Sequence, residues 1–118
     1  MAESSGEARV AALLTMANFK FQQEYEVPDL VASSGRPLRM DFVVFDDDGS
    51  IAFAIEYQGE QHYRAVDHFG GKKGLQRQKY NDRKKALYCL DHGIPLVTIP
   101  YWDYDRLTID YILEKANY

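Results

Sequence analysis

The stretch IAFAIEYQGEQHY, residues 51–63, joins an uninterrupted apolar run to a cluster of polar side chains. Such a run, bounded by turn residues, is typical of a strand that is buried on both faces. Just behind it the chain places two carboxylates, two amides, a glycine and a histidine. A surface turn needs only the glycine and a polar neighbour. The stretch therefore predicts a central strand that ends in a functional site.

Helix and strand patterns alternate on both sides of this stretch. Ser4 and Glu7 form a capping box, which predicts a helix at the start of the chain. Alternation over residues 19–27 predicts a half-exposed edge strand, and a loop is expected from Pro28 to Pro37. The other expected elements are strands at 38–45, 51–57 and 94–99, and helices over about 75–92 and 104–116. This order predicts an α/β fold with an αβββαβ core, in which helices flank a mixed sheet of an antiparallel meander and one parallel strand.

The turn between the second and third strands sets the register of their side chains. Asp48-Gly49 is the strongest two-residue hairpin signal in the chain, and it places Asp41 opposite Glu56. A longer, three-residue loop without a bulge would separate the two carboxylates. Like charges that face each other on a largely buried surface need a proton or a divalent cation. The alternative is that Asp41 pairs with Arg39 and that Glu56 only ends its strand.

Another carboxylate falls on the apolar face of the long predicted helix. Asp82 shares this face with Cys89, and a carboxylate so placed needs a partner. Lys79 or Lys85 would satisfy it as a structural ion pair. His62 is the partner of greater functional interest, because a carboxylate that holds an imidazole fixes its tautomer and raises its basicity.

Composition narrows the class of protein. The 118 residues are 46% hydrophobic, which suffices for a single domain, residues 1–118, with its own core. The single cysteine excludes an intramolecular disulfide and favours a reducing compartment. No apolar run is long enough to span a bilayer, and the N-terminus lacks a signal-peptide pattern. A cytoplasmic protein is therefore expected.

Basic residues are concentrated in one segment, although the net charge is −4. Of the 14 Lys and Arg residues, half fall between positions 72 and 85. A basic stripe on a mildly acidic body is able to hold a polyanion. The candidate DNA-binding residues are Lys72, Lys73, Arg77, Lys79, Arg83, Lys84 and Lys85. The alternative is a solvated helix face that has no ligand.

Together these residues resemble the restriction-endonuclease-like PD-(D/E)XK nucleases over nearly the whole chain. Within that superfamily the resemblance is closest to the very-short-patch-repair type and to phage homing endonucleases of the EDxHD type. The stretches that carry it are Gly6-Glu7, Met40-Asp41-Phe42, residues 55–62, residues 68–71, Asn81-Asp82 and residues 99–103. The resemblance implies a catalytic set formed by Glu7, Asp41, Glu56, Gln58, His62 and Asp82.

The resemblance also implies Mg²⁺ as the cofactor, for which Mn²⁺ is able to substitute. Asp41 and Glu56 would hold the metal, and Glu7 would hold water of its shell. Gln58 stands where the family carries a lysine, so we expect Gln58 only to orient water or phosphate. The role of general base then passes to His62.

The expected function is that of a single nuclease catalytic domain, a metal-dependent DNA endonuclease that hydrolyses phosphodiester bonds as part of a homing endonuclease. The expected partners are double-stranded DNA and a second copy of the chain, with a separate DNA-binding region outside these residues and with a phage as the source. Two alternatives stay open: a mismatch-repair nicking endonuclease, and a non-catalytic nucleic-acid-binding module on a decayed nuclease fold. Tyr101 and Trp102 lie within reach of DNA in this arrangement, but aromatic residues behind a strand are more often part of the core.

Overall fold

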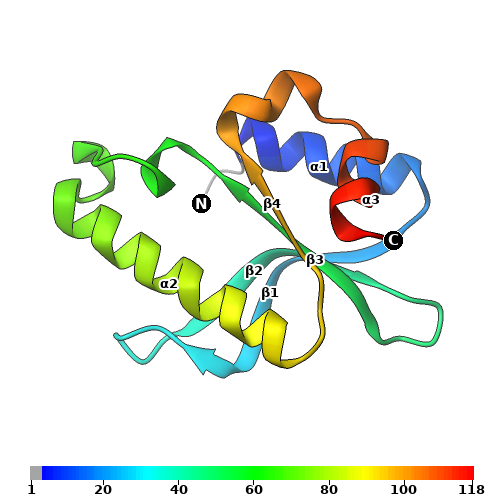
Figure 1. The fold of residues 1–118 in the computed structure, drawn as a ribbon, viewed down its shortest axis with the longest axis horizontal. Helices are drawn as coiled ribbons and strands as arrows, with labels where there is room; N and C mark the ends of the chain where they lie inside the picture. Colours follow the sequence, from blue (N-terminus) through cyan, green and yellow to red (C-terminus); the bar gives the residue numbers. More distant parts are fainter. Residues whose placement is uncertain (1–3) are drawn as a thin grey trace.

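The computed structural model describes residues 4–118, which form an α/β fold around one four-stranded sheet (Figure 1). The helices are α1 (Ser5–Met16), α2 (Gly71–Asp91) and α3 (Ile109–Ala116). The strands are β1 (Lys20–Val31), β2 (Pro37–Phe45), β3 (Ile51–Gln58) and β4 (Leu96–Pro100). Three short 3₁₀ turns complete the chain: η1 (Glu60–His62), η2 (Asp67–Phe69) and η3 (Tyr101–Arg106).

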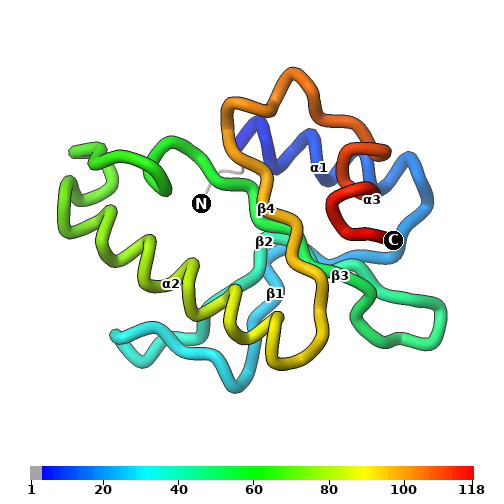
Figure 2. Tube along the Cα trace, viewed as in Figure 1, coloured from blue at the N-terminus to red at the C-terminus, as the bar shows by residue number. Residues whose placement is uncertain are grey.

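The sheet has the order β1-β2-β3-β4 and is mixed. Strands β1, β2 and β3 pair in antiparallel fashion, whereas β3 and β4 pair in parallel. A parallel neighbour requires a crossover, which here runs through η1, η2 and α2 before it returns to β4 (Figure 2). The predicted αβββαβ order, with its meander and one parallel strand, is confirmed, as is the position of β1 at an edge.

Helices cover both faces of the sheet. Val10 of α1 and Ile112 of α3 pack on one face against Phe42 and Ile55, all fully buried. Cys89 of α2 packs on the other face, in a cluster with Val27, Leu38, Met40, Val43 and Ala54. Strand β3 lies between two neighbouring strands and two helix layers, which explains its uninterrupted apolar run.

Several predicted element boundaries were wrong. Strand β1 continues through Pro28 as far as Val31, which an edge strand tolerates because the missing N–H need not serve a second neighbour. Helix α2 begins at Gly71, within the segment that its glycines suggested was a loop. Helix α3 begins only at Ile109, because the Thr108 side chain accepts from the Tyr111 N–H as its N-cap.

The β2–β3 hairpin keeps the predicted register by a different route. The Asp46 N–H donates to the Ser50 carbonyl at 2.8 Å, so the loop holds Asp47, Asp48 and Gly49 instead of the expected pair of residues. Gly49 has φ of +87°, which glycine adopts without strain. A register shift between Val44 and Phe45 then compensates for the longer loop. Within residues 4–118, no helix is long and apolar enough to cross a membrane.

Candidate active site

Strands β2 and β3 part at the two carboxylates that the sequence paired. The last pair of the ladder is Phe42 with Ile55, so Asp41 and Glu56 come next on the two strands. The Asp41 N–H donates to Glu56 Oε2 at 2.6 Å, and the Tyr57 N–H donates to Asp41 Oδ2 at 2.8 Å. Each carboxylate thus replaces a backbone acceptor at the point where the strands diverge. Side-chain bonds of this kind hold both carboxylates at fixed positions.

Lys85 of α2 is buried beside Glu56. Its Nζ donates to Glu56 Oε1 at 2.8 Å, with Lys85 8% and Glu56 3% exposed. The predicted role of Lys85 in DNA binding was therefore wrong, because a side chain enclosed in this way does not reach a phosphate backbone. The structure instead brings the Lys85 ammonium from α2 to the end of β3. There Gln58 occupies the position at which the nuclease family carries a lysine. The sequence signal for a lysine in the site was the (i, i+3) spacing of Asp82 and Lys85, which places both on one helix face but also fits a simple ion pair.

Burial and mutual repulsion shift the protonation of this group. Burial, and then the charge of Glu56, raise the pKa of Asp41 to about 8, while the Tyr57 N–H opposes the shift. Burial also raises the pKa of Glu56, although Lys85 acts against it. Burial acts to lower the pKa of Lys85, but the attraction of Glu56 outweighs it and the net shift is upward. Lys85 is therefore a cation at neutral pH, and Asp41 holds a proton unless another cation replaces it.

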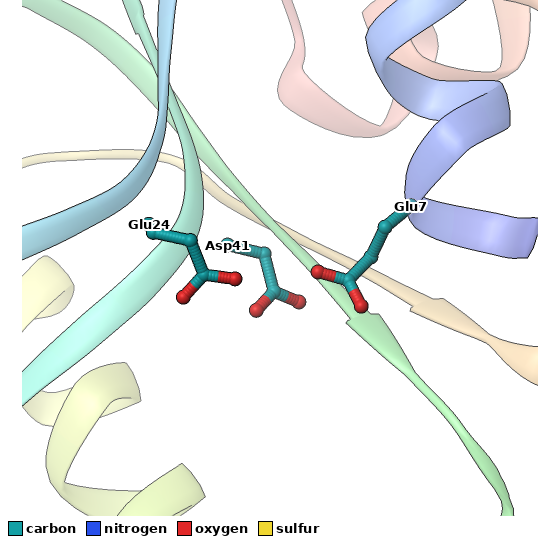
Figure 3. Close-up of side chains that lie close together, drawn as sticks. All are labelled: Glu7, Glu24 and Asp41. Carbon is teal, nitrogen blue, oxygen red and sulfur yellow. The ribbon is translucent and has the colours of Figure 1, made fainter. Parts of the chain in front are cut away.

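Two further carboxylates lie beside Asp41. One ligand oxygen from each of Glu7, Glu24 and Asp41 lies within 4.8 Å of the other two, and the three side chains converge from α1, β1 and β2 (Figure 3). Oxygen-only sets of this kind suit Mg²⁺ or Mn²⁺. Glu56, which we expected as the second metal ligand, is not a member of this cluster. We call Glu7, Glu24 and Asp41 the acidic cluster.

Glu24 was missed by the sequence analysis, which placed it on the polar face of an edge strand. The pairs Gln23–Phe42 and Tyr25–Met40 put Glu24 opposite Asp41 on the neighbouring strand. Its backbone has φ of +53°, an uncommon conformation for a residue with a side chain. Backbone strain of this kind is found most often at functional sites, where the surrounding structure holds it in place.

The predicted contact between His62 and Asp82 is present. His62 Nδ1 lies 2.8 Å from Asp82 Oδ2, with side-chain exposures of 9% and 20%. Gln78 Nε2 donates to the other oxygen, Asp82 Oδ1, at 3.1 Å. Asp82 is therefore held from two sides, and it fixes one ring nitrogen of His62, which leaves Nε2 for chemistry.

Gln58 ends β3 beside a cluster of aromatic rings. The Tyr63 hydroxyl donates to Gln58 Oε1 at 2.6 Å, and its ring centroid lies 4.6 Å from that of Trp102. Trp102 is 60% exposed and Tyr101 is partly buried, so the expectation that both belong to the core was wrong for Trp102. The η3 turn, which replaces the first part of the expected helix, carries Trp102 outward.

A cavity of about 260 Å³ lies beside Glu56, Lys85 and Asp82. It is lined by Glu56, Gln58, Asp82, Arg83, Lys85, Ala86, Leu96 and Thr98. The predicted residues Glu56, Gln58 and Asp82 thus border one space, whereas Glu7 and Asp41 meet in the acidic cluster, whose members do not line this cavity.

The basic segment divides into free and engaged side chains. Lys72, Lys73, Arg77, Lys79 and Arg83 are exposed along α2. Lys84 donates to the Val31 carbonyl and lies over the Tyr80 ring. Lys84 therefore ties α2 to the end of β1, and the five exposed residues are left as the candidate phosphate contacts.

Residues 9–115 match the family described as "Protein of unknown function (DUF2726)". "Uncharacterized protein 094L" of Frog virus 3 (isolate Goorha) is 34% identical over 102 residues, which cover 84% of this chain and 63% of the relative. "Uncharacterized protein 307L" of Invertebrate iridescent virus 6 is 35% identical over 52 residues, which cover 43% and 26%. The chain thus spans less than two thirds of the length of these relatives. No solved structure matches it significantly.

Proposed function

We propose that this chain, which belongs to the DUF2726 family, is a divalent-metal-dependent endonuclease that hydrolyses phosphodiester bonds in double-stranded DNA. The observation that carries the proposal is the environment of Asp41. This carboxylate is mostly buried, it carries a pKa raised to about 8, and it adjoins Glu7, Glu24 and Glu56. Carboxylates this close repel one another, and a proton or a divalent cation relieves the repulsion.

We also assign the fold to the restriction-endonuclease-like class. The support is the αβββαβ order together with the parting of two central antiparallel strands at an acidic pair. A strand end of this kind exposes side chains of a rigid sheet to a substrate, which suits the precise positioning that phosphodiester hydrolysis requires.

The donor set fits a hard divalent cation. The acidic cluster offers oxygen ligands only, and its closest oxygens are near enough to share one ion. Asp41 with Glu7 and Glu24 would hold Mg²⁺, or Mn²⁺ in its place. Such an ion, when bound, polarises a phosphate and stabilises the charge on a departing oxygen.

His62 is the proposed general base. Asp82 Oδ2 lies 2.8 Å from Nδ1, so an Nδ1–H would donate to it and leave Nε2 to accept a proton of the attacking water. Asp82 would also stabilise the imidazolium that forms. Gln78 fixes Asp82 in turn, so His62 is a positioned base and not a mobile surface side chain.

In the nuclease family a single lysine stands at the position of Gln58. We propose that Lys85 and Gln58 together take over its role. The Lys85 ammonium compensates Glu56 and borders the cavity. Gln58, held by the Tyr63 hydroxyl, would orient water or a phosphate oxygen with its amide donor. The exposed basic residues of α2 would contact the DNA backbone.

A non-catalytic nucleic-acid-binding module is the second candidate, and Gln58 favours it. The buried Lys85 and the held His62 oppose it, since a site without chemistry needs neither. Among catalytic proteins, the candidates are a homing endonuclease domain that acts as a dimer and a mismatch-directed nicking enzyme. The longer relatives leave room for a separate DNA-binding region in the whole protein.

A supercoiled plasmid tests the proposal. The wild-type protein should relax or linearise it with Mg²⁺ or Mn²⁺ and should be inactive in excess chelator. Asp91→Asn, which removes an exposed carboxylate at the far end of α2, is the matched control and should cleave normally. Tight, stoichiometric Mn²⁺ binding without cleavage would contradict the assignment as a nuclease, and absence of both would favour the binding module.

A further inference from the structure

A second cavity, of about 280 Å³, lies where η1 and η2 meet α2. It is lined by Gln61, Phe69, Gly74, Arg77, Gln78 and Asn81, which we call the amide pocket. Its volume is near the lower end of the range of roughly 300–1,000 Å³ for small-molecule sites. A cavity of this size suits one planar ring system better than a larger ligand.

Asn81, which lines the amide pocket, carries a buried acceptor without a partner within residues 4–118. Its Oδ1 is buried and has no hydrogen-bond partner among the residues that the structure describes. A buried acceptor left unpaired is costly, so a ligand that donates to it once the side chain turns gains affinity. The terminal torsion of asparagine is broad, so either amide atom is able to turn toward the cavity.

The rest of the lining suits the edge and face of a nucleobase. Gln61, Gln78 and Asn81 offer both donors and acceptors, and Arg77 adds donors, while the lining contains no carboxylate. Side chains of these types read base edges through paired hydrogen bonds. Phe69 is 50% exposed, which leaves a ring face on which a base is able to stack.

The amide pocket is closely packed against α2 and is linked to the proposed base. A Cβ on Gly74 would lie 1.9 Å from the Phe69 carbonyl oxygen, so η2 is seated directly on the backbone of α2. Gln78 of the lining donates to Asp82, which holds His62. Gln78 is therefore the one side chain between a group in the pocket and Asp82, the residue that positions the proposed base.

We propose that the amide pocket receives one unstacked nucleobase of the strand that is cut, next to the scissile phosphate. This inference rests on the proposed nuclease function and adds to it a determinant of substrate choice. A base inside a duplex is stacked on both sides, so it has to leave the stack to enter. Cleavage should then depend on which base occupies one position near the cut.

The test is cleavage of a DNA pool with random bases, followed by sequencing of the new ends. The wild-type protein should prefer some bases at a fixed distance from the cut. Asn81→Leu should reduce the preference at that one position by roughly 5- to 150-fold, the discrimination expected of a well-formed contact to a base. Phe69→Ala should reduce it as well, and because Phe69 is 50% exposed its removal leaves no enclosed cavity in the core.

Lys79→Ala is the matched control, because Lys79 is exposed on the same helix but does not line the amide pocket. It should slow cleavage of all sequences alike and keep the base preference. An abasic site at the mapped position should slow the wild-type protein by a similar roughly 5- to 150-fold. The same abasic site should not slow Asn81→Leu further, because the substitution and the abasic site remove the same contact between Asn81 and the base.

The outcomes separate the two proposals. If the wild-type protein cleaves the pool but Asn81→Leu and Phe69→Ala keep its base preference, the amide pocket does not bind a base while the nuclease assignment stands. If the abasic site slows both proteins equally, the base acts elsewhere and the inference is again overturned. If the wild-type protein does not cleave the pool with Mg²⁺ or Mn²⁺, the function and this inference both fail.

Discussion

At the scale of single residues, the site depends on ionisable side chains that are buried. Asp41, Glu56 and Lys85 are all wholly or mostly buried, and burial and then their charged neighbours shift the pKa of each. His62 differs from them, because one carboxylate, that of Asp82, holds it at Nδ1. The residue scale therefore yields one prediction about chemistry and one about stability.

His62→Ala should lose cleavage by ~10²–10⁴-fold, the usual effect of removing a general base, while metal and DNA binding persist. Asp82→Asn should give a smaller loss, because the amide favours the wrong imidazole tautomer. The double variant should be scarcely slower than His62→Ala, since the two residues act as a unit. Single-turnover rates measure all three. Multiplicative losses in the double variant would show that His62 and Asp82 act independently.

Lys85→Met should destabilise the fold by roughly 3–5 kcal/mol, because it leaves the Glu56 carboxylate buried without its partner. Adding Glu56→Gln should recover most of this loss, since a buried neutral amide needs no counter-charge. The free energy of unfolding in urea measures both variants. Equal stabilities of Lys85→Met and the wild-type protein would mean that Lys85 does not compensate Glu56.

At the scale of elements, α2 has three roles that are divided between an inner and an outer face. Its inner face carries Asp82 and Lys85 into the site, Cys89 fills the core, and its outer face presents the exposed basic residues. The heptad-like spacing in the sequence predicted Asp82 and Cys89 on one face, and that prediction was correct. The burial of Lys85 depends on the rotation of α2 against β3, which no local pattern encodes.

The exposed side chains of α2 should give DNA affinity that falls steeply with salt, because phosphate contacts release counterions. Replacing Lys72, Lys73 and Lys79 by Ala should weaken binding to every sequence and lower the slope of log K against log salt by about 3. Fluorescence anisotropy at several salt concentrations measures this. Lys84→Ala is the control, since Lys84 already donates to the Val31 carbonyl, and it should barely change the slope.

At the scale of the whole molecule, the sequence predicted the sheet and half of the site. The β2–β3 turn is local, so counting residues across it was enough to place Asp41 opposite Glu56. The predicted loop was one residue too short, but the register shift between Val44 and Phe45 compensates for the extra residue. Glu24 was missed because its place beside Asp41 depends on the register of β1 against β2 across a separate loop. The acidic cluster needs three elements to meet, which sequence spacing does not describe.

The metal-free protein should lose stability as pH rises. The pKa of Asp41 is raised from 3.8 to about 8, so the folded state holds this proton more tightly than the unfolded state does. That contribution is complete below about 3.8 and is lost as pH rises through about 8. In chelator, the free energy of unfolding should fall by a few kcal/mol between pH 5 and 9 on the order expected from linkage. Asp41→Asn should flatten this fall, and Mg²⁺ should oppose it in the wild-type protein only. An unchanged pH dependence in Asp41→Asn would contradict the assignment of the proton.

The most direct measurement is the single-turnover rate at which the wild-type protein and Asp41→Asn cut end-labelled double-stranded DNA in saturating Mg²⁺. In the variant the amide oxygen still accepts from the Tyr57 N–H, so the fold should be intact or more stable. We predict cleavage by the wild-type protein that stops in chelator, and none by a folded Asp41→Asn. Equal rates for the two proteins, or full activity in chelator, would contradict a metal-dependent nuclease centred on Asp41.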